Sequence, residues 1–190
     1  MVLEVILMDE TNPFTLNQVG YTIRTLQPAD AELLQALYDQ CADFTLLDEG
    51  EPVSATAAQD DLRAVPPGKS LEDKRVFGIF DPQGEAVGVL DALQDYPEAA
   101  VWWVGLLMLA PSERGKGLGR EAVLAFSEYA RLRGAQAIML GVVEENQPAL
   151  QFWQKIGFSP LRKTEPRPFG KKMQAVYILR CQIVQQAGGA

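Results

Sequence analysis

The sequence LLMLAPSERGKGLGR, residues 106–120, decides the fold of this 190-residue chain. Residues 106–109 form an apolar run typical of a buried strand, and Ala110-Pro111 predicts a turn. The glycine-rich segment that follows opens a helix expected to run to about Arg133. Alternating glycines let the backbone approach a ligand closely, and a helix N-terminus adds roughly half a positive charge and unpaired N–H donors. We therefore expect a phosphate cradle here, best suited to a pyrophosphate.

Two common phosphate-binding motifs do not fit this segment. The dinucleotide fingerprint requires G-x-G-x-x-G, whereas the glycines here fall as G-x-G-x-G, and the P-loop pattern is absent. The residues do match R-x-x-G-x-G at positions 114–119, after an apolar strand and an L-x-P turn at 109–111. This segment resembles the acyl-CoA-binding motif of the GNAT superfamily of N-acetyltransferases. A glycine-rich strand-to-helix turn with ordinary surface charges is the alternative interpretation.

The composition is that of one globular domain, with 47% hydrophobic and 22% charged residues. No apolar run approaches the roughly 20 residues of a membrane helix, and the N-terminus is a poor signal peptide, so we expect a cytoplasmic protein without membrane contact. Cys41 and Cys181 lack metal-ligand spacing. The chain has no histidine, which removes the commonest general base and most zinc sites. Catalysis without a metal is expected, using carboxylates, tyrosines, backbone amides or water.

The charge is unevenly distributed along the chain. Residues 1–100 hold 5 basic and 19 acidic side chains, whereas residues 101–190 hold 12 basic and 6 acidic ones, for a net charge of −8. The basic excess is small and is not interleaved with aromatic residues, which disfavours nucleic-acid binding. An acidic first half that faces a basic second half would suit a cationic acceptor that meets an anionic donor. The alternative is that these charges only solvate two surfaces.

The hydrophobic pattern predicts alternating strands and helices. Strands are expected at 21–26, 74–80, 86–93, 101–109, 136–143, 158–162 and 172–184. Helices are expected from Gln27-Pro28-Ala29-Asp30 to near Ala42, at 55–65, from Gly117 to about Arg133, and after Asn146 until Gly157. Residues 43–53 read as an exposed acidic loop, and 163–171 as a polar connection. The strand at 101–109 is expected to be central, with a bulge or close approach at Gly105.

A second block strengthens the resemblance. Leu140-Gly141-Val142, then Asn146 and Ala149, an aromatic pair and a K-x-G-F ending are similar to the other GNAT hallmark, about 30 residues after the glycine motif. The element order of residues 21–184 agrees as well. The chain is identified as a member of this family, with an α/β (α+β) fold in which helices flank a mixed central sheet. The acetyltransferase domain is expected at 20–185, after an extension or short strand at 1–19.

The resemblance implies where acetyl-CoA would bind. The cofactor would lie in a cleft where the strands at 101–109 and 136–143 splay apart. Amides of the glycine segment would hold the pyrophosphate, Leu109 would pair with the pantetheine arm, and Asn146 would bind pantetheine or only cap its helix. The cofactor-binding residues implied are Leu107, Met108, Leu109, Arg114, Gly115, Lys116, Gly117, Leu118, Gly119, Arg120, Asn146, Phe152 and Trp153.

The catalytic groups are less well defined. The resemblance also implies that the backbone amide of Leu107 polarises the thioester carbonyl. An attacking amine must be neutral, so a carboxylate or a water held by one must take its proton; Glu144 is the base we name, and Asp91, Glu98 and Glu145 are further candidates. Many family members have a tyrosine as general acid where this chain has Trp153, whose indole cannot deliver a proton. The thiolate would leave unassisted, or Tyr129 or Tyr177 would substitute.

The expected function is transfer of an acetyl group from acetyl-CoA to a primary amine of a small molecule, peptide or protein. A non-catalytic acyl-CoA-binding or sensor protein is the alternative, motivated by Trp153. A nucleotide-binding module of another fold is a third. The resemblance implies that residues 30–73 determine the choice of acceptor. The acidic cluster at 48–51 indicates a cationic acceptor, while Tyr96, Trp102 and Trp103 either line that side or belong to the core. Family members often dimerise, so a homodimer is also expected.

Overall fold

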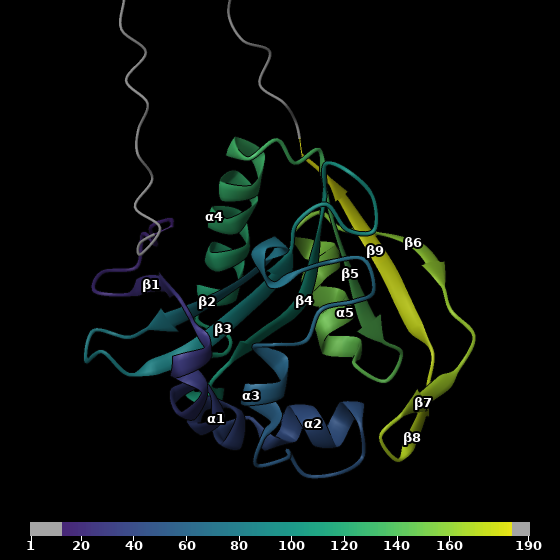
Figure 1. Ribbon diagram of the computed structural model, residues 1–190, viewed down its shortest axis with the longest axis horizontal. Helices are drawn as coiled ribbons and strands as arrows, with labels where there is room; N and C mark the ends of the chain where they lie inside the picture. The colour runs from purple at the N-terminus through teal and green to yellow at the C-terminus, as the bar shows by residue number, and fades with distance from the viewer. Residues whose placement is uncertain (1–12, 184–190) are drawn as a thin grey trace, which may run out of the picture.

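The computed structural model describes residues 13–183 and is built on one seven-stranded sheet in the order β1-β2-β3-β4-β5-β9-β6 (Figure 1). Neighbouring strands are antiparallel except β4 and β5, which are parallel. The sheet is therefore mixed, as predicted. Its strands are β1 (Thr22–Thr25), β2 (Lys74–Phe80), β3 (Ala86–Leu93), β4 (Val101–Leu109), β5 (Ala137–Val143), β6 (Ser159–Lys163) and β9 (Val176–Gln182).

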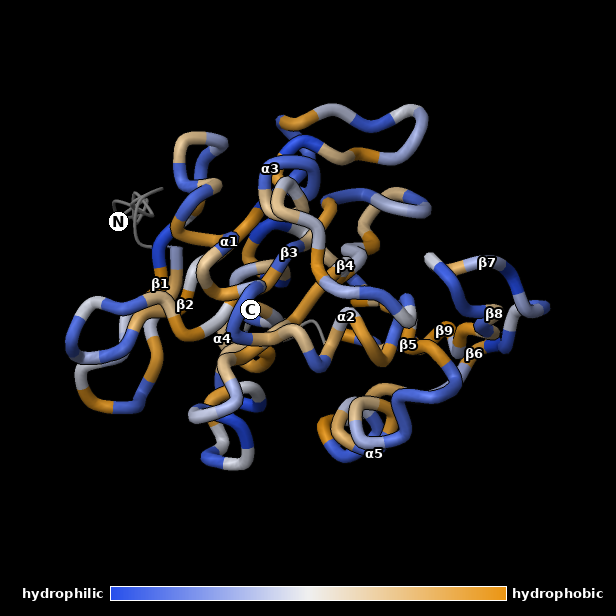
Figure 2. The backbone as a smooth tube through the Cα atoms, turned by 90° about the horizontal axis from the view of Figure 1, so that it is seen from below, coloured by the Kyte–Doolittle hydropathy of each residue, from blue (hydrophilic) through white to orange (hydrophobic). Residues whose placement is uncertain are grey.

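Helices cover both faces of the sheet. They are α1 (Ala31–Gln40), α2 (Ala42–Asp48), α3 (Ala57–Asp61), α4 (Leu118–Leu132) and α5 (Gln147–Lys155), with 3-10 turns at Pro28–Asp30, Leu71–Asp73 and Pro111–Glu113. Seen from below, α1 and α3 lie on one side of the sheet and α4 and α5 on the other (Figure 2). The short hairpin of β7 (Arg167–Phe169) and β8 (Lys172–Gln174) projects beside β6 and β9.

Aromatic residues form the core between the sheet and α4. Phe77 of β2 and Trp102 of β4 are fully buried against Phe126 and Tyr129 of α4, with ring centroids 5.3–6.2 Å apart. Large aromatic side chains supply much of the apolar area that a core buries. Trp102 is therefore a core residue. The helix predicted to begin at Gly117 is confirmed as α4, and its apolar face packs on this core.

The parallel strands β4 and β5 separate after four residue pairs. Their pairing ends at Val104 with Leu140, and the next residue on each strand is an exposed glycine, Gly105 and Gly141. The register between β3 and β4 skips Gly105, which confirms the predicted bulge. A Cβ on Gly141 would lie 2.9 Å from the side chain of Val176, so the fold requires glycine there. No side chain of these two residues fills the gap where the strands diverge.

Three expectations about local structure were wrong. Residues 43–53 are not a loop throughout, because α2 begins directly after α1 and ends at Asp48. The helix expected at 55–65 is shorter and corresponds to α3. The strand expected at 172–184 is divided by Ala175 into β8 and β9, and β7 lies within the connection expected at 163–171. The pairing of β7 with β8 creates a hairpin that local hydropathy does not encode.

The extension or strand expected at 1–19 falls partly outside the described residues, which begin at 13; residues 13–19 form no strand. Phe14 nevertheless packs on Phe77 and Tyr129.

Within residues 13–183, no helix is long and apolar enough to cross a membrane. The same residues contain no cluster of metal-ligating side chains.

Candidate active site

A cleft of about 740 Å³ opens where β4 and β5 diverge. It is lined by residues 103–107 of β4 and 139–143 of β5, by Asn146, Ala149 and Trp153 on one side of the sheet, and by Phe44 and Asp48 of α2 on the other. The cleft therefore passes through the sheet and joins two sides of the molecule. This is the position that the family resemblance implies for the cleft.

The backbone of β4 directs hydrogen-bonding groups into this gap. The amide of Ala110 donates to the carbonyl of Val87, 2.8 Å away. Along an antiparallel strand, the backbone N–H and C=O groups of successive residues point alternately toward and away from the partner strand. The backbone groups of Leu106 and Met108 therefore also point toward β3. Those of Leu107 and Leu109 point toward the side that β5 has left. The Leu107 amide thus points into the gap. Met108 has a buried side chain and offers no backbone group there.

The N-terminus of α4 lies at the end of the same strand and has no side-chain cap. The first helical hydrogen bond at this end runs from the Glu121 amide to the Gly117 carbonyl, so the amides of residues 118–120 precede the helical ladder. Gly115 and Gly117 have φ of 76° and 90°, which favours glycine, and no atom lies within 4 Å of a Cβ built on either. The result is an open, uncapped, electropositive helix end.

The charged side chains at this helix end are partly engaged within the protein. Arg114 forms a two-pronged ion pair with Asp43 of α2, and its Nε donates to the Leu109 carbonyl at 2.9 Å. Lys116 pairs with Glu113 at 3.1 Å, and hydrogen bonds from Tyr21 and Lys116 lower the pKa of Glu113. Arg120 is exposed and has no ion pair with another described residue. Through its ion pair with Asp43 and its hydrogen bond to Leu109, Arg114 therefore connects α2 to the glycine segment.

Two residues of the motif serve packing. The Leu118 side chain is fully buried, so only its amide is available to a ligand. A Cβ on Gly119 would lie 3.4 Å from both Leu109 and Phe152, which brings α4 close to β4 and α5. Phe152 thus supports the helix end from behind. These side chains shape the cradle without lining the cleft.

Asn146 caps α5, as the sequence predicted. Its Oδ1 accepts the Ala149 amide at 3.1 Å, and the residue also lines the cleft. Capping uses the amide oxygen only, so the Nδ2 donors are not needed for the cap. The two roles expected for Asn146 are compatible.

Trp153 is buried, with 6% of its surface exposed, and packs edge-on against Phe152 and Phe158 while it lines the cleft. Neither tyrosine expected as its substitute lines the cleft. Tyr129 belongs to the aromatic core, and Tyr177 lies beneath Lys163, whose Nζ is 5.3 Å from the ring centroid. The described residues thus hold no tyrosine acid at the position of Trp153.

All four carboxylates that the sequence nominated as bases are ion-paired. Glu144 pairs with Lys163 at 2.5 Å, Glu145 with Lys172 at 2.7 Å and Glu98 with Arg180 at 3.1 Å; these three are 45–62% exposed and do not line the cleft. Asp91 lines the cleft and is largely buried, with Lys74 at 2.7 Å. Burial raises the pKa of Asp91, whereas Lys74 opposes the rise. The geometry does not favour Glu144 as the base.

Asp48 is a cleft carboxylate that sequence reasoning assigned to a loop. It is the last residue of α2, and its Oδ1 is buried without a hydrogen-bond partner among the described residues. Burial raises its pKa to about 6, with Glu49 adding to the rise and Lys172 opposing it. The acidic cluster at 48–51 was the available signal, but Glu49 is exposed and Glu51 pairs with Lys171. Only Asp48 of this cluster reaches the cleft.

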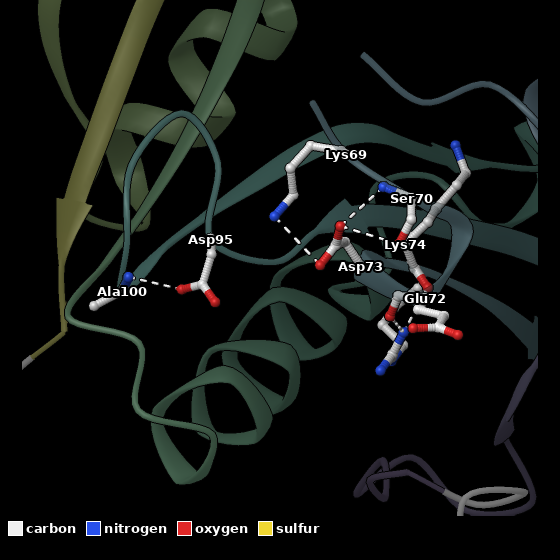
Figure 3. A network of polar contacts seen from close by, with 8 residues as sticks. Lys69, Ser70, Glu72, Asp73, Lys74, Asp95 and Ala100 are labelled. Atoms are coloured by element: carbon white, nitrogen blue, oxygen red, sulfur yellow. Dashed lines mark hydrogen bonds and ion pairs between the residues drawn. The ribbon is translucent and has the colours of Figure 1, made fainter. Parts of the chain in front are cut away.

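The far wall of the cleft is apolar and aromatic. Tyr96 and Trp103 both line it, with ring centroids 6.0 Å apart. The loop that carries Tyr96 is closed by a hydrogen bond from the Ala100 amide to the Asp95 carboxylate at 2.7 Å, and Asp73 closes the turn before Lys74 by accepting the Ser70 amide (Figure 3). These turns hold Tyr96 and Lys74 in the cleft wall.

Comparison with known proteins gives matches across most of the chain. Residues 34–158 match the model of the Acetyltransferase (GNAT) family. The chain is 28% identical to streptothricin acetyltransferase of Streptomyces lavendulae, over 73% of this chain and 82% of that protein. It is 30% identical to the uncharacterized N-acetyltransferase YobR of Bacillus subtilis over 46% of its length, and it covers only 34% of YobR. An acetyltransferase structure from Thermus thermophilus superposes with a TM-score of 0.66 at 29% identity, covering 84% of this chain and 96% of that one.

Proposed function

Because the chain belongs to the Acetyltransferase (GNAT) family, we propose that it transfers the acetyl group of acetyl-CoA to a primary amine. The observation that carries this proposal is the uncapped N-terminus of α4, placed beside two strands whose pairing ends just before Gly105 and Gly141. Few other ligands need both an anion site and a strand-like slot that leads from it. Coenzyme A has a diphosphate and an extended amide arm, which suit the two parts.

Several residues would hold the donor. The amides of Leu118, Gly119 and Arg120 would bind the diphosphate, and Lys116 and Arg120 would add charge. Arg114 retains donors beyond those that bind Asp43, but its main contribution would be to hold α2 against the glycine segment. The pantetheine arm would run along Leu107 and Leu109, with Asn146 on the opposite side.

The Leu107 amide would stabilise the negative charge that develops on the thioester oxygen, an interaction typically worth a few kcal/mol. The nitrogen of the neutral amine forms a bond to the carbonyl carbon, and the C–S bond breaks with its electron pair going to sulfur. A thiolate is a fairly stable leaving group, so Trp153 need not deliver a proton. The buried indole would instead exclude water from the thioester.

The acceptor is proposed to be a small-molecule amine. Streptothricin acetyltransferase, as its name states, modifies a small molecule, and the cleft of this chain is bounded by Phe44, Tyr96 and Trp103. An apolar wall next to Asp48 suits a cation that has a hydrocarbon or ring body. A peptide acceptor, a homodimer and a cytoplasmic location stay predictions.

Two measurements test the proposal. Calorimetry should detect binding of acetyl-CoA, and ATP and NAD should compete for the site less well than coenzyme A does. Thiol release from acetyl-CoA should follow with at least one amine among polyamines, aminoglycosides, amino acids and peptides. Binding without any turnover across this panel would support the alternative of an acyl-CoA sensor. Absence of binding would refute donor recognition itself.

A further inference from the structure

Amine attack requires a proton acceptor that is available in the cleft. An alkylammonium group with a pKa near ~10.4 is mostly protonated at neutral pH and cannot attack until it loses a proton. A carboxylate already bound to a lysine or arginine is stabilised in its ionised form and is a weaker base. Glu98, Glu144 and Glu145 are each in that state, whereas burial raises the pKa of Asp91 and the Lys74 ammonium occupies its Oδ2 at 2.7 Å.

Asp48 is the exception among the carboxylates that line the cleft. Its Oδ1 is buried and has no hydrogen-bond partner in the described part of the chain, whereas Asp91 has Lys74. A buried polar oxygen without a partner is uncommon and points to a ligand or a reacting group. The cleft that Asp48 lines also contains the Leu107 position, so both lie around one space.

The fold places α2 where such a group is needed. Both views show α2 between the diverging ends of β4 and β5 (Figures 1 and 2). The helix is fixed from two directions, because Arg114 binds Asp43 near its first turn and Gln174 of β8 donates to the carbonyls of Leu47 and Asp48 near its end. Lys172 also donates to the Leu47 carbonyl at 2.8 Å. These contacts hold the backbone around Asp48 and engage neither oxygen of its carboxylate, and the residue lines the cleft.

We propose that Asp48 is the catalytic base, accepting the proton of the acceptor amine directly or through one water molecule. The inference rests on the proposed acetyl transfer. Asp48 takes one proton from the alkylammonium group and passes it to solvent, which frees the nitrogen lone pair. The lone pair forms the C–N bond with the acetyl carbon, and the excess N–H proton of the adduct moves to the carboxylate of Asp48. The C–S bond breaks with its electrons on the sulfur of coenzyme A. The proton on Asp48 then passes through solvent to the thiolate, which restores the carboxylate.

The surroundings suit Asp48 to this role. Desolvation raises the pKa of Asp48 to about 6, so it is ionised at pH 7 while being more basic than an ordinary carboxylate. The charged groups near it are Glu49 on its own helix and Lys172 of β8, whose ammonium is held by the Leu47 carbonyl and Glu145. The other charged residues that line the cleft are Lys74 with Asp91, Arg162 and Arg167.

The test compares Asp48→Asn with Glu49→Gln in the full chain. Glu49 is the adjacent carboxylate, is exposed and does not line the cleft, so its variant is a matched control. Thiol release is measured from pH 5 to 9 with the amine of the panel that the wild type acetylates fastest. Asp48→Asn should lower kcat by about 100-fold or more, in the range typical of a lost general base. It should also remove the acidic limb of the kcat/KM profile near pH 6, while Glu49→Gln keeps kcat within a few-fold and keeps the limb, moved to lower pH because Glu49 contributes to the raised pKa of Asp48.

Calorimetry with acetyl-CoA separates the possible failures. Asp48→Asn should bind acetyl-CoA with unchanged affinity and keep the circular dichroism spectrum of the wild type, which shows that donor binding and folding are intact. A variant that keeps kcat within a few-fold, or that raises only the KM for the amine, overturns the assignment while leaving acetyl transfer in place. A wild type that binds acetyl-CoA but acetylates no amine overturns both.

Discussion

Gly117→Asp, compared with Gly134→Asp, tests the anion site at the N-terminus of α4. The two glycines flank the same helix, have φ of 90° and 84°, and have no atom within 4 Å of an added Cβ. A side chain at such φ costs up to about 1–2 kcal/mol, so each variant should lose roughly 2–8 °C in Tm. The backbone-strain part of the folding penalty is therefore closely matched between the two variants.

The effect on ligand binding should differ sharply. A carboxylate at position 117 would compete for the amides of residues 118–120 and would repel the diphosphate. Two phosphate charges at about 5 Å in water give roughly 1.7 kcal/mol of repulsion, which is more than tenfold in Kd. Position 134 follows the other end of α4 and should leave the affinity unchanged.

Calorimetric titration of both variants with acetyl-CoA, after thermal melts confirm that each is folded, gives the comparison. The reasoning is refuted if folded Gly117→Asp binds acetyl-CoA with the wild-type Kd. It is refuted equally if Gly134→Asp loses as much affinity, because the loss would then follow from backbone strain and not from the anion site.

Three further predictions concern single side chains. Asn146→Ala should lower the free energy of unfolding, measured in urea, by about 1 kcal/mol and should weaken acetyl-CoA binding. Asn146→Asp should keep the helix cap and weaken only acetyl-CoA binding. If Asn146→Asp binds acetyl-CoA normally, Asn146 serves only as a cap. Lys74→Met should leave Asp91 without its cation and lower the free energy of unfolding in urea at pH 7 by about 3 kcal/mol. The double variant Lys74→Met/Asp91→Asn should recover part of this stability. An unchanged urea midpoint for Lys74→Met would contradict a stabilising buried pair. Asp48 has a raised pKa in the folded state, so its contribution to stability is fully present below about pH 4, the ordinary value, and is lost as pH rises through about 6. Asp48→Asn should therefore be more stable than the wild type at pH 8, by about 1–2 kcal/mol after allowance for its partial solvent exposure, and equal to it near pH 4. Thermal melts across this range check the sign, and a variant that is less stable at pH 8 would contradict it.

Much of the fold could be read from local patterns. The bounds of β2, β3 and β4 agree with those predicted, because each is a short apolar run ended by a turn signal. The N-terminus of α4 and the cap of α5 were also predicted, since Gly117 and Asn146 act through their own backbone and nearest neighbours. The divergence of β4 and β5 followed from the family resemblance and not from hydropathy.

The sequence by itself determined the family, the order of the strands and helices apart from α2 and the β7–β8 hairpin, and the glycine segment, because these depend on contacts within a few residues. Only the tertiary structure decided which carboxylates are neutralised. Glu144 meets Lys163, and Asp91 meets Lys74, across 19 and 17 residues of chain, and Asp48 approaches the cleft only because α2 is held by β8. The basicity of a carboxylate depends on which charges and how much water surround it in space, and a linear pattern does not record either.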